Sequence, residues 1–121
     1  MSSNQVNRDS EARQARLDKI VRESYNEIYL INDKTLAFEY ANTSALKNLG
    51  YTVSELGSLK LTDLFSYPDE MGLEALLNSL RRSETDRLQL QLRFRRKNGT
   101  LYDADVLMQV LEKDQSFVII V

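Results

Sequence analysis

The segment LQLQLRFRRKNGTLYDADV, residues 88–106, constrains the fold more than any other part of the chain. Apolar and polar residues alternate on both sides of a turn signal, which is typical of two strands with one oily face and one charged face. A three-residue loop, residues 97–99, keeps the two oily faces together, whereas a two-residue loop would mismatch every face. The sequence therefore predicts a hairpin with Gly99 in the left-handed position of a type I turn plus bulge.

This loop length fixes the register of the hairpin. The predicted pairs are Phe94 with Tyr102, Leu92 with Ala104 and, on the outer face, Arg93 with Asp103. Because cross-strand partners share a face of the sheet, the first two pairs point inward and the charged pair points outward.

The composition limits the chemistry that the chain can perform. The 121 residues suit one domain, and 42% hydrophobic with 28% charged residues is an ordinary globular composition. A net charge of -2 gives no reason to expect nucleic acid or an anionic membrane as partner. No apolar run approaches the roughly 20 residues of a membrane span, and the polar first residues do not form a signal peptide. We expect a cytoplasmic domain without membrane contact.

The N-terminal part predicts an amphipathic helix. Residues 1–8 are polar and are expected to be disordered or left over from expression, and the helix is expected over residues 9–25. Leu17, Ile20 and Val21 share one face of this helix. Such a narrow stripe must pack on something, because short isolated helices are marginal in water. The alternatives are its own sheet and a second copy of the chain, and we favour a homodimer.

The rest of the chain alternates strand and helix signals. The predicted strands are 27–32, 37–42 and 116–121, and the helical pieces are 43–49, 52–56, 62–65 and a longer helix after residues 66–70 that carries Leu73, Leu76, Leu77 and Leu80. Strands 28–31 and 117–121 are apolar at successive positions, so they should lie in the centre of the sheet. The hairpin strands, polar on one face, should lie nearer an edge.

Four residues fit structural roles that need no ligand. Asn42 can cap the helix that follows it, and Gly50 can end that helix. Glu55 lies three residues after Thr52, the spacing of a capping box. Gly99 serves the hairpin turn.

Three motifs, in this order and at this spacing, resemble a PAS domain of the bacterial sensory-box type. They are Tyr40-Ala41-Asn42, then Leu49-Gly50-Tyr51-Thr52 with Ser54-Glu55-Leu56, then Arg95-Arg96-Lys97-Asn98-Gly99. The resemblance covers residues 26–121. It implies an α+β fold with a five-stranded antiparallel sheet in the order 2-1-5-4-3 and helices on one face. It also implies a sensor and dimerisation module of a larger signalling protein, such as a histidine kinase of a two-component system or a diguanylate cyclase.

The chain departs from the cofactor-binding members of that family. It has no Cys and no His. Haem held through His, a covalent flavin adduct and an iron–sulfur cluster are therefore disfavoured, and no metal site is expected. The sequence itself names no cofactor, so the cofactor is unknown from the residues alone.

A ligand pocket is the sharper expectation. The fold implied by the resemblance would place it between the oily face of the sheet and the helix of Leu73. The candidate lining residues are Tyr40, Phe65, Leu76, Leu77, Leu90, Leu92, Tyr102, Ala104, Val106 and Met108. The alternative is a filled core, because native interiors leave few voids larger than a water molecule.

These observations favour a regulatory module that senses a small molecule or relays a signal through dimer geometry. A ligand-free dimerisation and relay domain is the alternative. A small enzyme acting on an apolar substrate is a third hypothesis, and it would need a buried acid or base. Glu39 is the main candidate acid, although alternation from Tyr40 points it away from the pocket.

Overall fold

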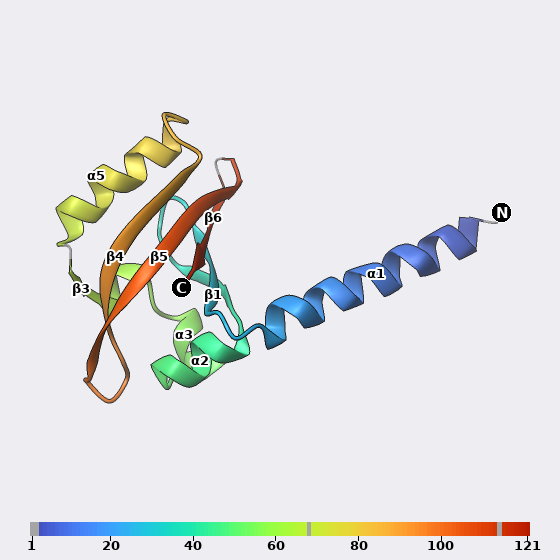
Figure 1. The fold of residues 1–121 in the computed structure, drawn as a ribbon, viewed down its shortest axis with the longest axis horizontal. Coiled ribbons are helices and arrows are strands. Elements are labelled where there is room, and N and C mark those ends of the chain that lie inside the picture. Colours follow the sequence, from blue (N-terminus) through green and yellow to red (C-terminus); the bar gives the residue numbers. More distant parts are fainter. Residues whose placement is uncertain (1–2, 68, 114) are drawn as a thin grey trace.

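The computed structural model describes residues 3–67, 69–113 and 115–121. One curled antiparallel sheet packs against a group of helices, and a long N-terminal helix projects away from them (Figure 1). The elements are α1 Ser3–Glu23, β1 Ile28–Asn32, β2 Phe38–Ala41, α2 Thr43–Leu49, α3 Val53–Gly57, α4 Leu61–Leu64, β3 Phe65–Tyr67, α5 Glu70–Arg81, β4 Arg87–Arg95, β5 Leu101–Glu112 and β6 Ser116–Ile120.

The sheet has six strands in the order β2-β1-β6-β5-β4-β3. The expected α+β class and the central position of the first and last strands are confirmed. The expected number of five strands was wrong, because the three-residue strand β3 pairs with the edge of β4. Three residues are too few to show an alternating pattern, so this strand depends on the tertiary position of β4.

The β4–β5 hairpin has the predicted register. Phe94 faces Tyr102, Leu92 faces Ala104 and Arg93 faces Asp103. The Nε of Arg93 donates to Asp103 at 2.8 Å on the exposed face. The turn is closed by a hydrogen bond from the amide of residue 99 to the carbonyl of Arg96, and Gly99 has a φ of 89°.

The predicted caps of helices α2 and α3 are also present. The side chain of Asn42 accepts a hydrogen bond from the amide of Ala45 and so caps α2, and Gly50 ends α2 with a φ of 82°. Thr52 and Glu55 form the reciprocal capping box of α3. Glu55 also pairs with Lys97 of the hairpin turn at 2.5 Å, which ties α3 to the β4–β5 turn.

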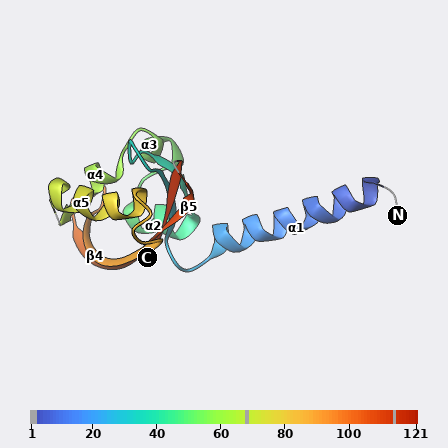
Figure 2. The same ribbon diagram turned by 90° about the horizontal axis from the view of Figure 1, so that it is seen from above.

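The core lies between the concave face of the sheet and helices α2 to α5. β4 bends around α5 (Figure 2). Leu73, Leu77 and Leu80 of α5 are buried together with Leu92 and Met108 of the sheet. Burying each of these side chains stabilises the fold by roughly 1.5–3 kcal/mol.

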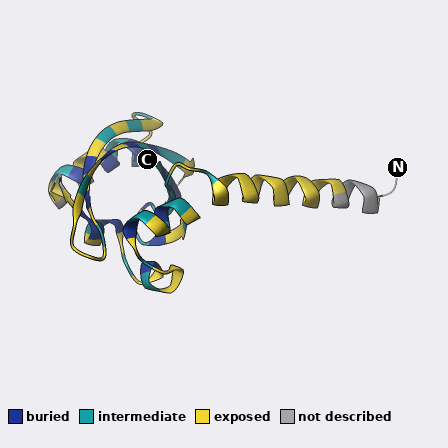
Figure 3. Cartoon of the chain, turned by 60° about the horizontal axis from the view of Figure 1, so that its bottom comes forward, coloured by how far each residue is buried: buried dark blue, intermediate teal, exposed yellow. Residues whose placement is uncertain are grey.

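Helix α1 begins at Ser3, before the expected residue 9, and ends at Glu23, before the expected residue 25. It does not cover the sheet of its own chain, since it extends away from the domain and its described side chains are exposed (Figure 3). Leu17 is 50% exposed and Ile20 is 65% exposed. The alternative that this stripe packs on the sheet of its own chain is therefore wrong. Packing against a second copy of the chain stays a prediction. In the described part of the chain, no helix combines the length and the apolar character needed to cross a membrane.

Replacing Gly99 by Ala should lower the free energy of unfolding by roughly 1–2 kcal/mol, because the left-handed backbone costs an L-residue about that much. Gly57→Ala is the matched control: Gly57 lies in α3, and nothing approaches its added methyl group within 4 Å. Urea denaturation should show the control unchanged or slightly more stable. Equal losses in both variants would contradict the turn assignment.

Candidate functional site

The junction between α1 and the domain is organised by the buried side chain of Asn42. Its Oδ1 accepts from the amides of Ile28 and Ala45, each at 3.1 Å. Its Nδ2 donates to the carbonyls of Val21 at 2.9 Å and Asn26 at 2.8 Å. One amide group therefore joins the last turn of α1, the connector 24–27, the start of β1 and the first turn of α2.

Glu27, the last residue of the connector, makes a second set of contacts. Its Oε1 accepts hydrogen bonds from the hydroxyls of Tyr29 at 2.7 Å and Tyr102 at 3.0 Å. Its Oε2 accepts from the side-chain amide of Asn48 at 3.0 Å. The connector is thus bonded to the central strand β1, to β5 and to α2 by one carboxylate, which accepts charge-assisted hydrogen bonds.

The two tyrosines continue into a row of aromatic rings through the core. Tyr29 lies 5.7 Å from Phe38 and 6.4 Å from Phe94, measured between ring centroids. Phe94 in turn lies 5.5 Å from Tyr102. Because packed side chains transmit displacement, a shift of the inner sheet face would move the hydroxyls that Glu27 holds.

Arg96 closes the network on the solvent side. Its guanidinium lies 4.4 Å from the centroid of the Tyr102 ring, a cation–π contact. Its Nε donates to the backbone carbonyl of Asn48 at 3.0 Å. Arg96 therefore fixes both the ring of Tyr102 and the helix that carries Asn48.

Both tyrosines are held in the neutral form. Burial, followed by the neighbouring phenol and the charge of Glu27, raises the pKa of Tyr29 far above its usual value. Burial, followed by the charge of Glu27, raises the pKa of Tyr102 as well. Both hydroxyls stay protonated and act as hydrogen-bond donors at neutral pH.

The structure brings most of the predicted pocket residues together, as members of the packed core. Those that are buried in it are Phe65, Leu77, Leu92, Ala104, Val106 and Met108, with Leu90 and Tyr102 partly buried against them. Tyr40 and Leu76 do not join them, since they are 38% and 40% exposed. Whether the core opens to a ligand stays a prediction.

Tyr40 lies outside the core because the β1–β2 ladder contains a bulge. Tyr40 pairs with Leu30, but Phe38 pairs with Ile31, so the register shifts by one residue at Glu39. Strict alternation therefore assigns Tyr40 to the wrong face. Leu76 lies at the margin of the buried stripe of α5, which consists of Leu73, Leu77 and Leu80.

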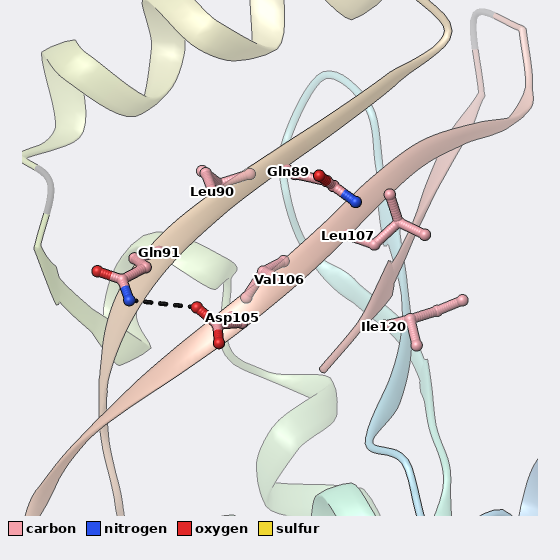
Figure 4. Close-up of a pocket in the computed structure, with 7 residues that line it drawn as sticks. All are labelled: Gln89, Leu90, Gln91, Asp105, Val106, Leu107 and Ile120. Carbon is pink, nitrogen blue, oxygen red and sulfur yellow. Dashed lines mark hydrogen bonds between the residues drawn. The ribbon is translucent and has the colours of Figure 1, made fainter.

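Two of the hollows on the described surface lie beside the sheet. A hollow of about 200 Å³ lies where β2 meets α2 and α3 and is lined by Phe38, Tyr40, Leu46, Val53 and Leu56, among others. A shallower hollow of about 610 Å³ lies on the outer face of the sheet. Figure 4 shows Leu107 and Ile120 side by side there, next to Asp105 and its partner Gln91.

Sequence reasoning missed Glu27, Tyr29 and Arg96 as site residues. Glu27 precedes an apolar strand and carries no motif, so only the fold shows that two phenols and an amide converge on it. Among the described residues, no group of three or more acidic side chains is arranged as a metal site.

The architecture defines the class of protein. It is a small α+β domain in which one curled sheet encloses the core and a protruding helix is bonded to the sheet through a polar junction. Among solved structures, the chain is similar to the PAS domain of an HTR-like protein from Haloarcula marismortui, with 18% identity over 97% of this chain and 96% of that chain and a TM-score of 0.82.

Two further solved structures share the fold. A domain of a sensory box sensor histidine kinase/response regulator from Geobacter sulfurreducens matches with 14% identity, over 89% of this chain and 92% of that chain, with a TM-score of 0.71. The PAS domain, in complex with ethanol, of a LuxR-family transcriptional regulator from Burkholderia thailandensis matches with 13% identity, over 86% and 94%, with a TM-score of 0.66. No match was found among curated protein sequences.

The profile of the PAS domain matches residues 26–121, and the chain therefore belongs to the PAS domain family. Domains of this family are generally sensory or regulatory rather than catalytic, which agrees with what the resemblance implied.

Replacing Asn42 by Ala should lower the free energy of unfolding by roughly 2–4 kcal/mol, because buried backbone groups lose their partners. Hydrogen exchange of the amides of Ile28 and Ala45 should also become faster. Asn26→Ala, at an exposed position of the connector, is the matched control and should change little. A loss of stability without faster exchange at these amides would contradict the junction role.

The tyrosine pair predicts an alkaline loss of stability. Because the folded-state pKa of both phenols is raised, stability is fully present below the unfolded value of about 10 and falls as pH rises above it, where only the unfolded chain loses these protons. The variant Tyr29→Phe/Tyr102→Phe should show a flatter decline in urea midpoint above about pH 10. Exposed Tyr25→Phe is the control, and an unchanged slope in the double variant would contradict this assignment.

Proposed function

We propose that this PAS domain is a regulatory relay whose output is the position of α1 in a homodimer. The observation that carries the proposal is the junction, in which Asn42 and Glu27 bond the exposed helix α1 and its connector directly to the sheet and to α2. A displacement of the core would reach α1 through these bonds without crossing a flexible linker.

The exposed faces support an assembly of two copies. The stripe of Leu17, Ile20 and Val21 is exposed on α1. The outer face of the central strands carries half-buried apolar residues, with Leu107 opposite Ile120 in the register of β5 and β6. Exposed apolar faces of this kind commonly mark interaction surfaces. Pairing of α1 with α1, or of α1 with the outer face of a second copy, would cover them.

Relay through such a dimer requires two arrangements of the junction. A signal can shift the population between them only if it binds or stabilises one arrangement better than the other. The row of rings from Phe38 to Tyr102 supplies a path from the inner sheet face to Glu27. In this proposal, the effector that α1 controls is a separate domain outside residues 1–121. We propose a histidine kinase or a diguanylate cyclase that acts in the cytoplasm.

Sensing of a small molecule is the second candidate function. The hollow of about 200 Å³ between β2 and α2–α3 favours it, because most of its lining residues are apolar. The similar PAS domain from Burkholderia thailandensis was solved in complex with ethanol, which is a molecule of suitable size. The enzyme hypothesis has little support, because Glu39 is exposed.

Native mass spectrometry of the purified chain tests both candidates in one sample. We expect a dimer for the wild type, and a monomer for Ile20→Glu/Val21→Glu, because charges in the stripe cannot be buried without a partner. A mass excess that disappears on denaturation would support ligand sensing, and a bare dimer would support relay alone.

The matched control is Ala12→Glu/Ala15→Glu, which adds the same charge to the opposite, exposed face of α1. It should remain dimeric. If the stripe variant stays dimeric, or if the wild type is monomeric at high concentration, α1 does not form the dimer interface and the relay proposal fails.

A further inference from the structure

A third hollow, of about 160 Å³, lies at the end of the sheet opposite the α1 junction. Three segments meet there: the turn after β1, the C-terminal end of α5 and the β5–β6 hairpin (Figure 1). Arg81, the last residue of α5, is one of the residues that line this hollow.

The guanidinium of Arg81 is held rigidly at this hollow. Its Nη1 bonds to Glu74 at 3.1 Å and to Asn78 at 3.0 Å, both from α5. Its Nε donates to the backbone carbonyl of Asp33 at 2.7 Å. The remaining nitrogen, Nη2, is buried and has no hydrogen-bond partner in the described part of the chain.

Asp33 lines the same hollow, and its side chain has a buried acceptor atom without a hydrogen-bond donor. The residue is only 5% exposed, and its Oδ1 is buried without a hydrogen-bond partner. No ion pair joins its carboxylate to a cation within residues 3–67, 69–113 and 115–121. A buried carboxylate without a partner is costly, and orphaned buried polar atoms are rare in native proteins.

We propose that this hollow binds a small zwitterion, a free α-amino acid, with its ammonium group on Asp33 and its carboxylate on Arg81. The orphaned Oδ1 of Asp33 needs a donor and the orphaned Nη2 of Arg81 needs an acceptor, and the ammonium and carboxylate of one amino acid would supply both. The charged side chains of the lining are balanced, with Asp86 and Lys113 beside Asp33 and Arg81, so neither an anion nor a cation alone is favoured.

The apolar part of the lining sets the size of the ligand. Leu80, Val110 and Phe117 leave an apolar wall for a short aliphatic side chain. The volume corresponds to about five water molecules of liquid, which suits alanine, serine or valine better than an aromatic amino acid. This site does not depend on the relay proposed above, and its failure would leave that proposal unaffected.

The test is a titration of the full ¹⁵N-labelled chain with L-alanine, L-serine or L-valine, followed by amide chemical shifts. We expect saturable shifts confined to the turn after β1, the end of α5 and the β5–β6 hairpin, with a Kd between about 10 μM and 1 mM. Asp33→Asn should weaken binding by about tenfold or more, since the ammonium loses its counter-charge. Asp105→Asn, an exposed position on the outer sheet face, should bind as the wild type does.

Two further measurements keep the proposal falsifiable. Asp33→Asn should melt at the same temperature as the wild type or higher without ligand, because an uncompensated buried charge is removed. Acetamide, a neutral molecule with a donor beside an acceptor, should bind far more weakly than alanine. Absence of saturable shifts, equal binding by acetamide, or a lower melting temperature together with lost binding would each overturn the proposal.

Discussion

The buried amide of Asn42 is the interaction on which the arrangement of this domain depends. A carboxamide offers two donors and an acceptor with two lone pairs, and here all of them are used. No other side chain of this size could cap α2, receive the amide of Ile28 and hold the carbonyls of Val21 and Asn26 together. Since these groups would otherwise be buried without partners, the junction has one arrangement that is strongly preferred.

The remaining contacts of the junction extend this constraint into the core. Glu27, the last residue of the connector, accepts hydrogen bonds from the hydroxyls of Tyr29 and Tyr102. The rings of these two tyrosines belong to the row of aromatic rings in the core. The domain therefore couples an apolar interior to an exposed helix through a hydrogen-bonded polar junction. A fully satisfied hydrogen-bonded junction of this kind is rigid, so it would pass a displacement of the core to α1 rather than absorb it, which suits a regulatory module of the PAS family.

Prediction from the sequence succeeded where the local pattern and the tertiary structure agree. The β4–β5 hairpin is the best instance, because alternation, loop length and Gly99 all require one register. It failed at Tyr40, because the bulge at Glu39 moves this residue to the outer face of the sheet. It also failed at β3, because so short a strand shows no alternating pattern of its own. The direction of α1 could not be predicted either, since an amphipathic stripe indicates that a helix packs but not on what.

The sequence by itself determined the elements other than β3, the caps of α2 and α3, the hairpin register and the family, because these depend on local patterns and motifs. Only the tertiary structure decided which distant side chains meet. Glu27 and Tyr102 are separated by 75 positions, and Asp33 and Arg81 by 48, so their convergence depends on how the sheet curls. No periodicity encodes such pairs, because each member satisfies only its local pattern until the fold places the other beside it.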